Sequence, residues 1–161
     1  APAESVVMEK PEPWGRLKAE TTYKWPYLED KAGNRVDLSV LPSDRVVADE
    51  TAFLTSLKDS WYAILNPSLK LGFALRWDLS VFQHIWFWQS YWIPDHPWFG
   101  KAYCIALEPC TGYPTALEQL KRGTIKKFQG NSSLETKLIA TVFSDIESVK
   151  TVTTDGAVIP C

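Results

Sequence analysis

One aromatic stretch, Ile85-Trp86-Phe87-Trp88-Gln89-Ser90-Tyr91-Trp92, decides the fold of this chain, and it stops at Pro94-Asp95. A short run of aromatic residues bounded by turn-forming residues is typical of a strand. Successive side chains of a strand point to opposite faces. We therefore expect the even-numbered residues from His84 to Trp88 on one face and the odd-numbered residues from Ile85 to Gln89 on the other. Both faces are then largely apolar, which favours a strand buried between two sheets.

Comparable short runs, separated by turn residues, lie on either side of this stretch. Residues 35–41 alternate polar and apolar residues, which predicts a half-buried strand closed by the turn Pro42-Ser43-Asp44. Residues 1–35 are rich in proline and charge and are expected to form extended, looping chain. Further strands are expected at residues 61–65, 70–77, 101–107, 123–128, 134–143 and 148–153. Together these runs predict an antiparallel all-β protein.

One helix is expected among the strands. Thr115-Ala116-Leu117-Glu118 has the form of a capping box, in which the threonine caps a backbone N–H and the glutamate returns the bond. Gly123 ends this helix after about two turns. Glu118 therefore has a structural explanation, and Glu135 and Glu147 are interpreted as solvated surface residues.

Composition restricts the function classes. The chain has 161 residues, 45% of them hydrophobic and 22% charged, which is ordinary for one soluble domain. A net charge of −2 with no basic stripe argues against nucleic acid as a partner, and no apolar run approaches the ~20 residues of a membrane helix. Three cysteines at irregular spacing favour reduced thiols and a cytoplasmic location. The residues show no metal-ligand cluster, phosphate loop or nucleotide motif, so no metal and no cofactor is expected.

Six of the eight tryptophans lie within residues 61–98. Such density is explained by a buried strand, because aromatic rings supply a large contact area. It is also explained by a sugar platform, because the C–H patches of a pyranose ring pack on aromatic faces. The candidate walls of such a site are Trp86, Trp88 and Trp98, and the candidate polar contacts to sugar hydroxyls are Arg76, Asp78 and Gln89.

Each polar candidate has a structural alternative. Arg76 and Asp78 are two residues apart and are also explained by a surface salt bridge. Gln89 is also explained by a buried hydrogen bond to the backbone. His84 and His96 are interpreted as solvated or structurally bonded histidines.

Glu108 is the candidate catalytic residue. In the run that precedes it, the bulky side chains of Tyr103, Ile105 and Leu107 share one face, and only the small residues Ala102, Cys104 and Ala106 occupy the other. This small-residue face leaves room for a ligand beside the Glu108 carboxylate at the strand end, where partial burial can tune a carboxylate as a general base. A capping or salt-bridged glutamate explains the same pattern.

Several segments of the chain resemble the aldose 1-epimerase family, specifically a divergent branch of it. The resemblance spans roughly residues 20–145, and the order and spacing of the segments carry it. They are Trp61-Tyr62-Ala63-Ile64 with Asn66-Pro67, Leu71-Gly72-Phe73-Ala74-Leu75-Arg76-Trp77-Asp78, Trp86-Phe87-Trp88-Gln89, Pro97-Trp98-Phe99-Gly100-Lys101-Ala102-Tyr103, Ala106-Leu107-Glu108-Pro109, and Ser133-Leu134-Glu135-Thr136 leading to Ala140-Thr141-Val142-Phe143.

The resemblance implies a large antiparallel β-supersandwich of the galactose mutarotase type that binds monosaccharides. It implies that the protein interconverts α and β anomers: a glutamate removes the proton of the anomeric hydroxyl while a histidine protonates the ring oxygen, and the ring opens and recloses. Glu108 lies where the resemblance places that glutamate. Mutarotation needs no cofactor.

The chain departs from the family in its length and in its histidines. Family members are longer, and their proton-donating histidines lie well upstream of the glutamate, so the role is not carried over to His84 or His96. We therefore expect residues 1–161 to be the C-terminal portion of a single mutarotase-like domain, completed by upstream sequence or by another copy or chain. The alternatives are a carbohydrate-binding β-sandwich module without catalysis and an interaction scaffold that uses the aromatic face.

Overall fold

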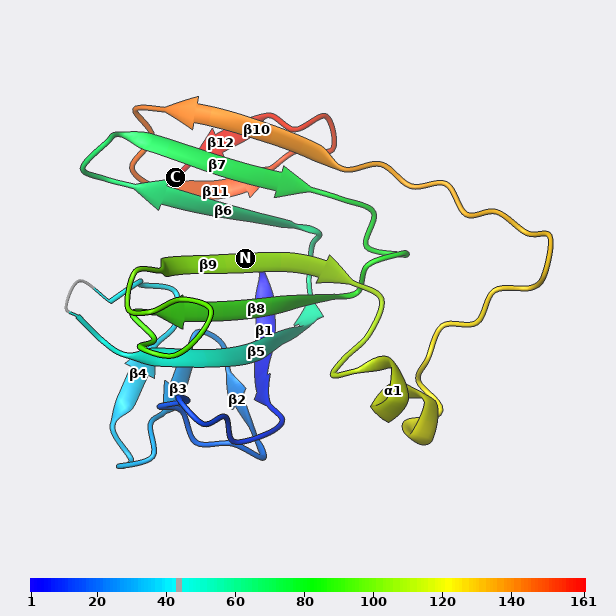
Figure 1. Cartoon of the computed structure of the whole chain (residues 1–161). Coiled ribbons are helices and arrows are strands. Elements are labelled where there is room, and N and C mark those ends of the chain that lie inside the picture. The colour runs from blue at the N-terminus through cyan, green and yellow to red at the C-terminus, as the bar shows by residue number, and fades with distance from the viewer. Residues whose placement is uncertain (43–44) are drawn as a thin grey trace.

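A computed structural model describes residues 1–42 and 45–161, which form a mostly β protein with antiparallel sheets and one short helix (Figure 1). In chain order the first strands are β1 (Ala3–Met8), β2 (Thr21–Lys24), β3 (Tyr27–Glu29), β4 (Arg35–Asp37), β5 (Ala48–Leu57), β6 (Trp61–Asn66) and β7 (Leu71–Arg76). They are followed by β8 (His84–Tyr91), β9 (Tyr103–Cys110), α1 (Ala116–Arg122), β10 (Ile139–Ser144), β11 (Val149–Val152) and β12 (Val158–Pro160).

The largest sheet has five strands in the order β2-β1-β5-β8-β9, and all its neighbours are antiparallel. The aromatic strand β8 lies between β5 and β9, with Phe87 opposite Ala52 on one side and Leu107 on the other. β9 forms one edge of this sheet. That position explains how Pro109 is accommodated within a strand, because a proline lacks the N–H that an interior strand needs.

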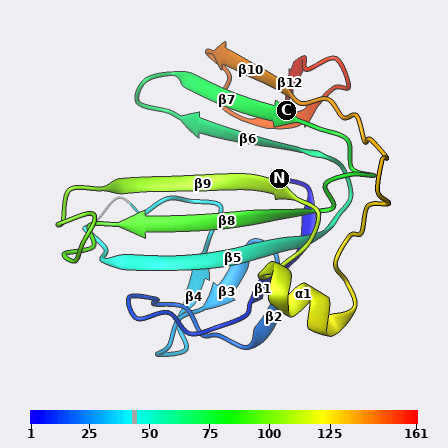
Figure 2. The same ribbon diagram turned by 45° about the vertical axis from the view of Figure 1, so that its right-hand side comes forward.

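A three-stranded sheet, in the order β10-β7-β6, packs between the five-stranded sheet and the β11–β12 hairpin. Tyr62 from β6 joins the main core together with Ile85 and Phe87 from β8. Trp61, the neighbour of Tyr62, points the other way and packs against Val152 of β11. Figures 1 and 2 both show β10, β7 and β6 beside the β9 edge of the five-stranded sheet, and the small β3–β4 hairpin on the far side.

The main core covers one face of the five-stranded sheet. The side chains of Leu54 and Ile85 are both 0% exposed on this face, and Phe87 is 3% exposed. Leu28 and Leu38, from the β3–β4 region, belong to the same core. Full burial of such a side chain contributes about 1.5–3 kcal/mol, so these alternating positions hold the sheet to its covering layers.

The expected strands at residues 61–65, 70–77, 85–92 and 148–153 are confirmed within one or two residues. The strand expected at 134–143 is confirmed only from Ile139 onward. The strand expected at 35–41 is shorter, because the backbone N–H and hydroxyl of Ser39 donate to the Asp37 carboxylate at 2.9 and 2.6 Å and turn the chain after Asp37. Ser43 and Asp44, from the turn expected to close that strand, lie outside the described residues.

Two expectations about strands are wrong, and one strand was missed. Residues 123–128 form no strand, because Thr124 and Ile125 donate their N–H groups to Gln119 O at the helix end. Residues 1–35 are not simply looping chain, since they contain β1, β2 and β3. The central strand β5 was not foreseen, because Asp49-Glu50 near its start is unfavourable in a strand by propensity.

The expected helix is confirmed as α1. The Thr115 hydroxyl accepts from the Glu118 N–H at 3.4 Å, and Gly123 ends the helix in the left-handed conformation, with φ of 69°. Only half of the expected capping box forms, because the Glu118 carboxylate bonds Lys121 instead of returning to the cap. No helix in the described part of the chain is long and apolar enough to cross a bilayer.

Candidate functional site

The two faces of β8 differ in exposure. His84, Trp86 and Trp88 are half-buried, and Ile85, Phe87 and Gln89 between them are buried. The expected alternation is therefore confirmed, but only one of the two faces is fully covered. We call the other the open face. It carries the side chains of Asp49, Thr51 and Phe53 on β5, His84, Trp86, Trp88 and Ser90 on β8, and Cys104, Ala106, Glu108 and Cys110 on β9, of which Phe53 and Ser90 are buried.

The open face places Glu108 directly across from Trp86 in the β8–β9 register. Opposed residues on one face of an antiparallel pair have Cβ atoms about 4.5–5.5 Å apart. Ala106 stands opposite Trp88 and Cys104 opposite Ser90, so the small-residue face predicted for β9 lies beside the tryptophans. The Glu108 side chain is exposed, and β9 continues past it to Cys110, so it does not stand at the strand end as expected.

Both indole rings of the open face are fixed by hydrogen bonds. Trp86 Nε1 donates to Gly112 O at 3.0 Å, and Trp88 Nε1 donates to Asp49 Oδ1 at 2.8 Å. Trp98, from the loop between β8 and β9, tilts against Trp88 with ring centroids 5.7 Å apart. The three predicted aromatic walls and the predicted base thus lie on one face.

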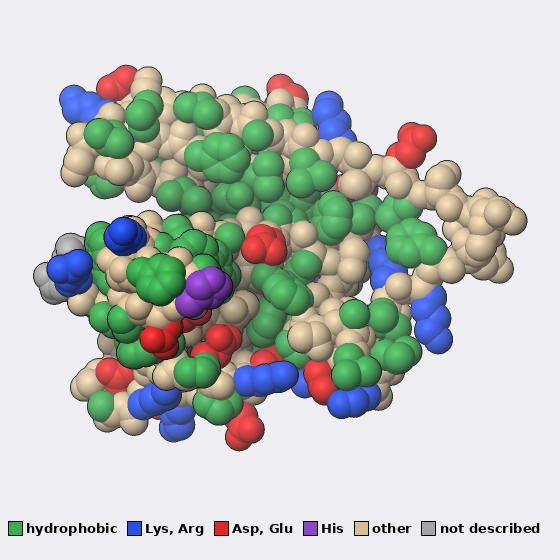
Figure 3. Space-filling model, in the orientation of Figure 1, with side chains coloured by type: hydrophobic (Ala, Val, Ile, Leu, Met, Phe, Trp, Pro, Cys, Tyr) green, Lys and Arg blue, Asp and Glu red, His purple; other side chains and the backbone are tan. Residues whose placement is uncertain are grey.

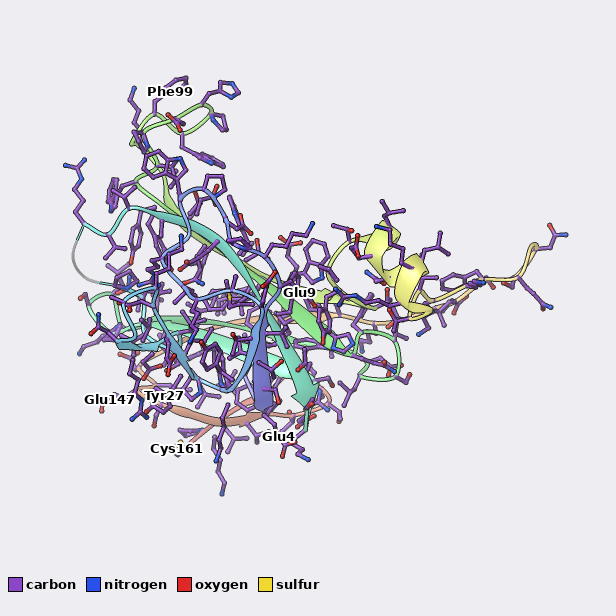
Figure 4. All side chains as sticks on the ribbon, turned by 90° about the horizontal axis from the view of Figure 1, so that it is seen from below. Glu4, Glu9, Tyr27, Phe99, Glu147 and Cys161 are labelled. Carbon is purple, nitrogen blue, oxygen red and sulfur yellow. The ribbon has the colours of Figure 1, made fainter. Side chains whose placement is uncertain are left out.

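The loop that carries Trp98 projects from the sheet on the side of the open face. Figure 4 shows its outermost residue, Phe99, on the opposite side of the molecule from Tyr27 and Cys161, while α1 flanks the sheet at its other end. In Figure 3, which views the open face, hydrophobic and acidic side chains adjoin over the five-stranded sheet. The face is therefore both aromatic and acidic.

A small hollow adjoins Trp86 over β5. Its volume is about 180 Å³, and Glu12, Thr51, Phe53 and Trp86 contribute to its lining. Pockets for drug-sized ligands measure roughly 300–1,000 Å³, so this hollow suits a smaller molecule. Burial raises the pKa of the Glu12 carboxyl, and the nearby carboxylates of Asp49 and Glu50 raise it further.

Arg76 and Asp78 do not join this group. Arg76 lies on β7 in the other sheet, where Nη1 donates to Asp59 Oδ1 at 2.6 Å and to Val152 O at 3.2 Å. Asp78 lies beyond the end of β7 and accepts from the N–H and hydroxyl of Ser80, which lowers the pKa of its carboxyl. The ion pair considered between Arg76 and Asp78 is thus replaced by two separate local contacts. Both residues line a different hollow, of about 370 Å³.

Gln89 faces the core and not the open face. Its side chain is 1% exposed, and Oε1 accepts from the Tyr91 hydroxyl at 3.2 Å and from Arg16 Nη2 at 3.4 Å. The hydrogen bond expected to the backbone is therefore made to side chains. Beside it, the fully buried Glu50 carboxylate accepts from Arg16 Nε at 2.8 Å.

Sequence reasoning missed two acidic neighbours of the tryptophans. Asp49 was missed because β5 was not foreseen, and Glu12 because residues 1–35 were expected to loop. A hydrophobic run at residues 52–54 was the available signal for β5. His84 was correctly placed on the face of Trp86, but its position relative to Glu108 depends on strand register, which the sequence does not encode.

Comparison with known proteins returns no matching family model, no matching curated protein and no matching solved structure.

Proposed function

We propose that this protein binds a monosaccharide on the open face and interconverts its anomers, with Glu108 as the general base. The proposal includes membership of the aldose 1-epimerase family and a fold that is part of a β-supersandwich of the galactose mutarotase type. The observation that carries the proposal is the cross-strand pair of Trp86 and Glu108 on a half-exposed face.

The tryptophans supply the binding part of the proposal. Trp86 and Trp88 are held by hydrogen bonds at their Nε1 atoms, so their rings are pre-oriented and lose little freedom when a ligand binds. The axial and equatorial C–H groups of a pyranose then stack on the rings, while its hydroxyls meet the carboxylates around them. Trp98 closes the platform from the loop between β8 and β9.

Glu108 supplies the chemical part. Its carboxylate is exposed beside the small side chain of Ala106, on the same strand face, so a sugar on Trp86 finds an unobstructed base next to it. The base takes the proton of the anomeric hydroxyl, the bond between the anomeric carbon and the ring oxygen breaks, and the ring oxygen takes a proton from water, which gives the open-chain aldehyde. Ring closure on either face of the aldehyde gives either anomer.

A non-catalytic sugar-binding module is the second candidate. The observation that favours it is that the aromatic platform of Trp86, Trp88 and Trp98 is held by hydrogen bonds and ring contacts in which Glu108 takes no part. Calorimetry with a panel of neutral monosaccharides tests binding, and polarimetry on freshly dissolved α-glucose and α-galactose tests turnover.

Glu108→Gln is the variant that separates the two candidates. The substitution keeps the shape of the side chain and removes the base, so we expect sugar affinity to persist and the mutarotation rate to fall by about 10²- to 10⁴-fold. Glu147→Gln is the matched control, because Glu147 is also exposed but lies far from Phe99 in Figure 4, on the other side of the molecule. An unchanged rate in Glu108→Gln rejects Glu108 as the base, and binding without any turnover in the native protein favours the module.

A further inference from the structure

A second hollow, which we call the Arg76 hollow, lies at one end of the three-stranded sheet, where β6 begins, β7 ends and β10 begins. Its volume is about 370 Å³, within the range of roughly 300–1,000 Å³ that holds small organic ligands. Four separate segments contribute its lining: Asp59 and Ser60, residues 76–79, Lys137 and Ile139, and Thr154. The hollow is therefore formed by tertiary packing, in a different sheet from the tryptophans of the open face.

The guanidinium of Arg76 is anchored through one nitrogen only. Arg76 is the last paired residue of β7, between Trp61 of β6 and Ile139 of β10. Its side chain is 15% exposed, and Nη1 donates to Asp59 Oδ1 at 2.6 Å and to Val152 O at 3.2 Å. In the described parts of the chain, Nε and Nη2 make no hydrogen bond, and neither is among the unpaired polar atoms that are sealed from the surface. These two nitrogens therefore remain accessible to a ligand.

The unused edge of this guanidinium suits a carboxylate. The N–H groups of Nε and Nη2 are nearly parallel, and this planar fork matches the two oxygens of a carboxylate. Because Asp59 and Val152 already hold Nη1, the fork is oriented before any ligand arrives. A pre-oriented group loses little conformational freedom on binding.

A second cation contributes to the same lining. Lys137 is exposed, and its ammonium forms no ion pair or hydrogen bond with any residue that the structure describes. Lys126 lies close by, where its ammonium donates to Ser80 O and Val81 O. Together with Arg76, these lysines make three cations at this end of the sheet.

Two aspartates of the hollow are partly occupied. Asp59 Oδ1 accepts from the Ser60 N–H as well as from Arg76, and Asp78 Oδ1 accepts from the N–H and hydroxyl of Ser80. Within the described residues the Oδ2 atom of each aspartate has no donor, so it can accept from a hydroxyl. Three cations and two carboxylates leave one positive charge, which a ligand with a single carboxylate neutralises.

We propose that the Arg76 hollow binds a small hydroxylated organic acid. Its carboxylate lies on Nε and Nη2 of Arg76 with the Lys137 ammonium beside it, and its hydroxyls donate to Asp59 and Asp78. The site binds its ligand without a covalent step. This inference is independent of the proposed function, because it uses no residue of the open face.

A series of ligands tests the chemistry of the site by calorimetry on the full chain. Gluconate is the probe, because it is acyclic and offers no pyranose ring to the tryptophans. Sorbitol is its matched control, because it has a CH₂OH group in place of the carboxylate. We expect gluconate to bind, sorbitol to show no binding, and gluconate affinity to fall in about 1 M salt, where the Debye length is about 3 Å. Acetate, which lacks the hydroxyls, and inorganic phosphate are expected to bind at least about tenfold more weakly.

Two substitutions test the residues of the site. Lys137→Gln removes an exposed cation and is expected to weaken gluconate binding about two- to fivefold, whereas Lys31→Gln, in the exposed turn after β3, is expected to leave it unchanged. Arg76→Lys keeps a cation near Asp59 but removes the fork, so we expect a loss of about tenfold or more. Urea denaturation checks that this variant is folded. If it is not, Lys137→Gln and the ligand series still decide the outcome.

Several outcomes would overturn the inference. These are no binding of gluconate to the native protein, native affinity in both Lys137→Gln and Arg76→Lys, and phosphate binding as tight as gluconate binding, which would show a general anion site. Loss of gluconate binding in Trp86→Ala would place the ligand on the open face instead. Glucose binding and mutarotation are expected to be unchanged in Lys137→Gln, so failure at this site and failure of the proposed function give different results.

Discussion

The two faces of the five-stranded sheet are built from alternate residues of the same strands, yet a carboxylate on one face differs from a carboxylate on the other in burial and in hydrogen bonding. On the covered face, Glu50 is 0% exposed and accepts hydrogen bonds from Arg16 Nε, Arg16 N and Leu17 N at 2.8, 2.9 and 3.1 Å. On the open face, Glu108 is exposed and forms no hydrogen bond or ion pair within the described residues. A carboxylate whose two oxygens both accept hydrogen bonds from the protein serves the fold, whereas one left free beside aromatic rings is available to a ligand.

The same contrast applies to the neighbours of each carboxylate. Gln89 and Tyr91 surround Glu50 with a buried hydrogen-bonded network, and their fixed positions bind the segment around Arg16 to the sheet. Around Glu108 the neighbours are Trp86, Ala106 and Cys110, which occupy little of its hydrogen-bonding capacity. Position on one face or the other thus decides whether a carboxylate is bonded within the fold or left free at the surface.

The largest effect on stability is expected from a substitution that removes a buried carboxylate from the covered face. Glu50→Ala removes the acceptor for three donors and leaves the Arg16 guanidinium without its partner, so we expect a loss of about 3–5 kcal/mol in the free energy of unfolding. Urea denaturation followed by tryptophan fluorescence measures it. Glu108→Ala is the control on the open face, with an expected change within about 0.5 kcal/mol. Equal losses in both variants would contradict the division between the faces.

Two adjacent residues on β8 sharpen the comparison. Ile85→Ala removes a fully buried side chain and is expected to cost about 2–5 kcal/mol of stability, with sugar affinity unchanged in the folded protein. Trp86→Ala removes one ring of the aromatic platform and is expected to weaken sugar binding by about 1–2 kcal/mol, roughly tenfold. Calorimetry and denaturation on both variants measure the two quantities. A fall in sugar affinity in Ile85→Ala would show that the site is not confined to the open face.

The smallest effect is expected at the rim of the open face. Arg122 of α1 donates two hydrogen bonds of 2.8 Å to the Glu9 carboxylate, and this contact lowers the pKa of Glu9. Because that pKa lies below the value in the unfolded chain, the stabilisation is present above about pH 4.3 and is lost as the pH falls through the lowered pKa. Glu9→Gln is therefore expected to cost about 0.2–1 kcal/mol near neutral pH and nothing in strong acid. Denaturation curves at several pH values measure it, and a pH-independent difference would contradict the ion pair.

Local sequence patterns determined a good part of this protein. Alternation over residues 84–91 determined which side chains share a face, because a strand has a period of two. Small residues before Glu108 determined that one side of β9 is uncrowded, and Thr115 with Gly123 determined both ends of α1. These features depend only on neighbouring residues, so they can be derived without knowing the sheet.

Tertiary structure alone decided what those faces meet. The β8–β9 register placed Glu108 opposite Trp86 and placed His84 two residue pairs away from them. The pairing of β5 with β8 placed Asp49 near Trp88. The tertiary structure also places Arg76 in another sheet and Gln89 in the core, so neither residue lies with the tryptophans of the open face as their sequence positions had suggested. Register and sheet order depend on contacts between residues far apart in the chain, whose closure cost and packing no local pattern contains. The sequence therefore determined that Glu108 lies on an open strand face, and only the packing of the sheets decided which aromatic and titratable groups stand beside it.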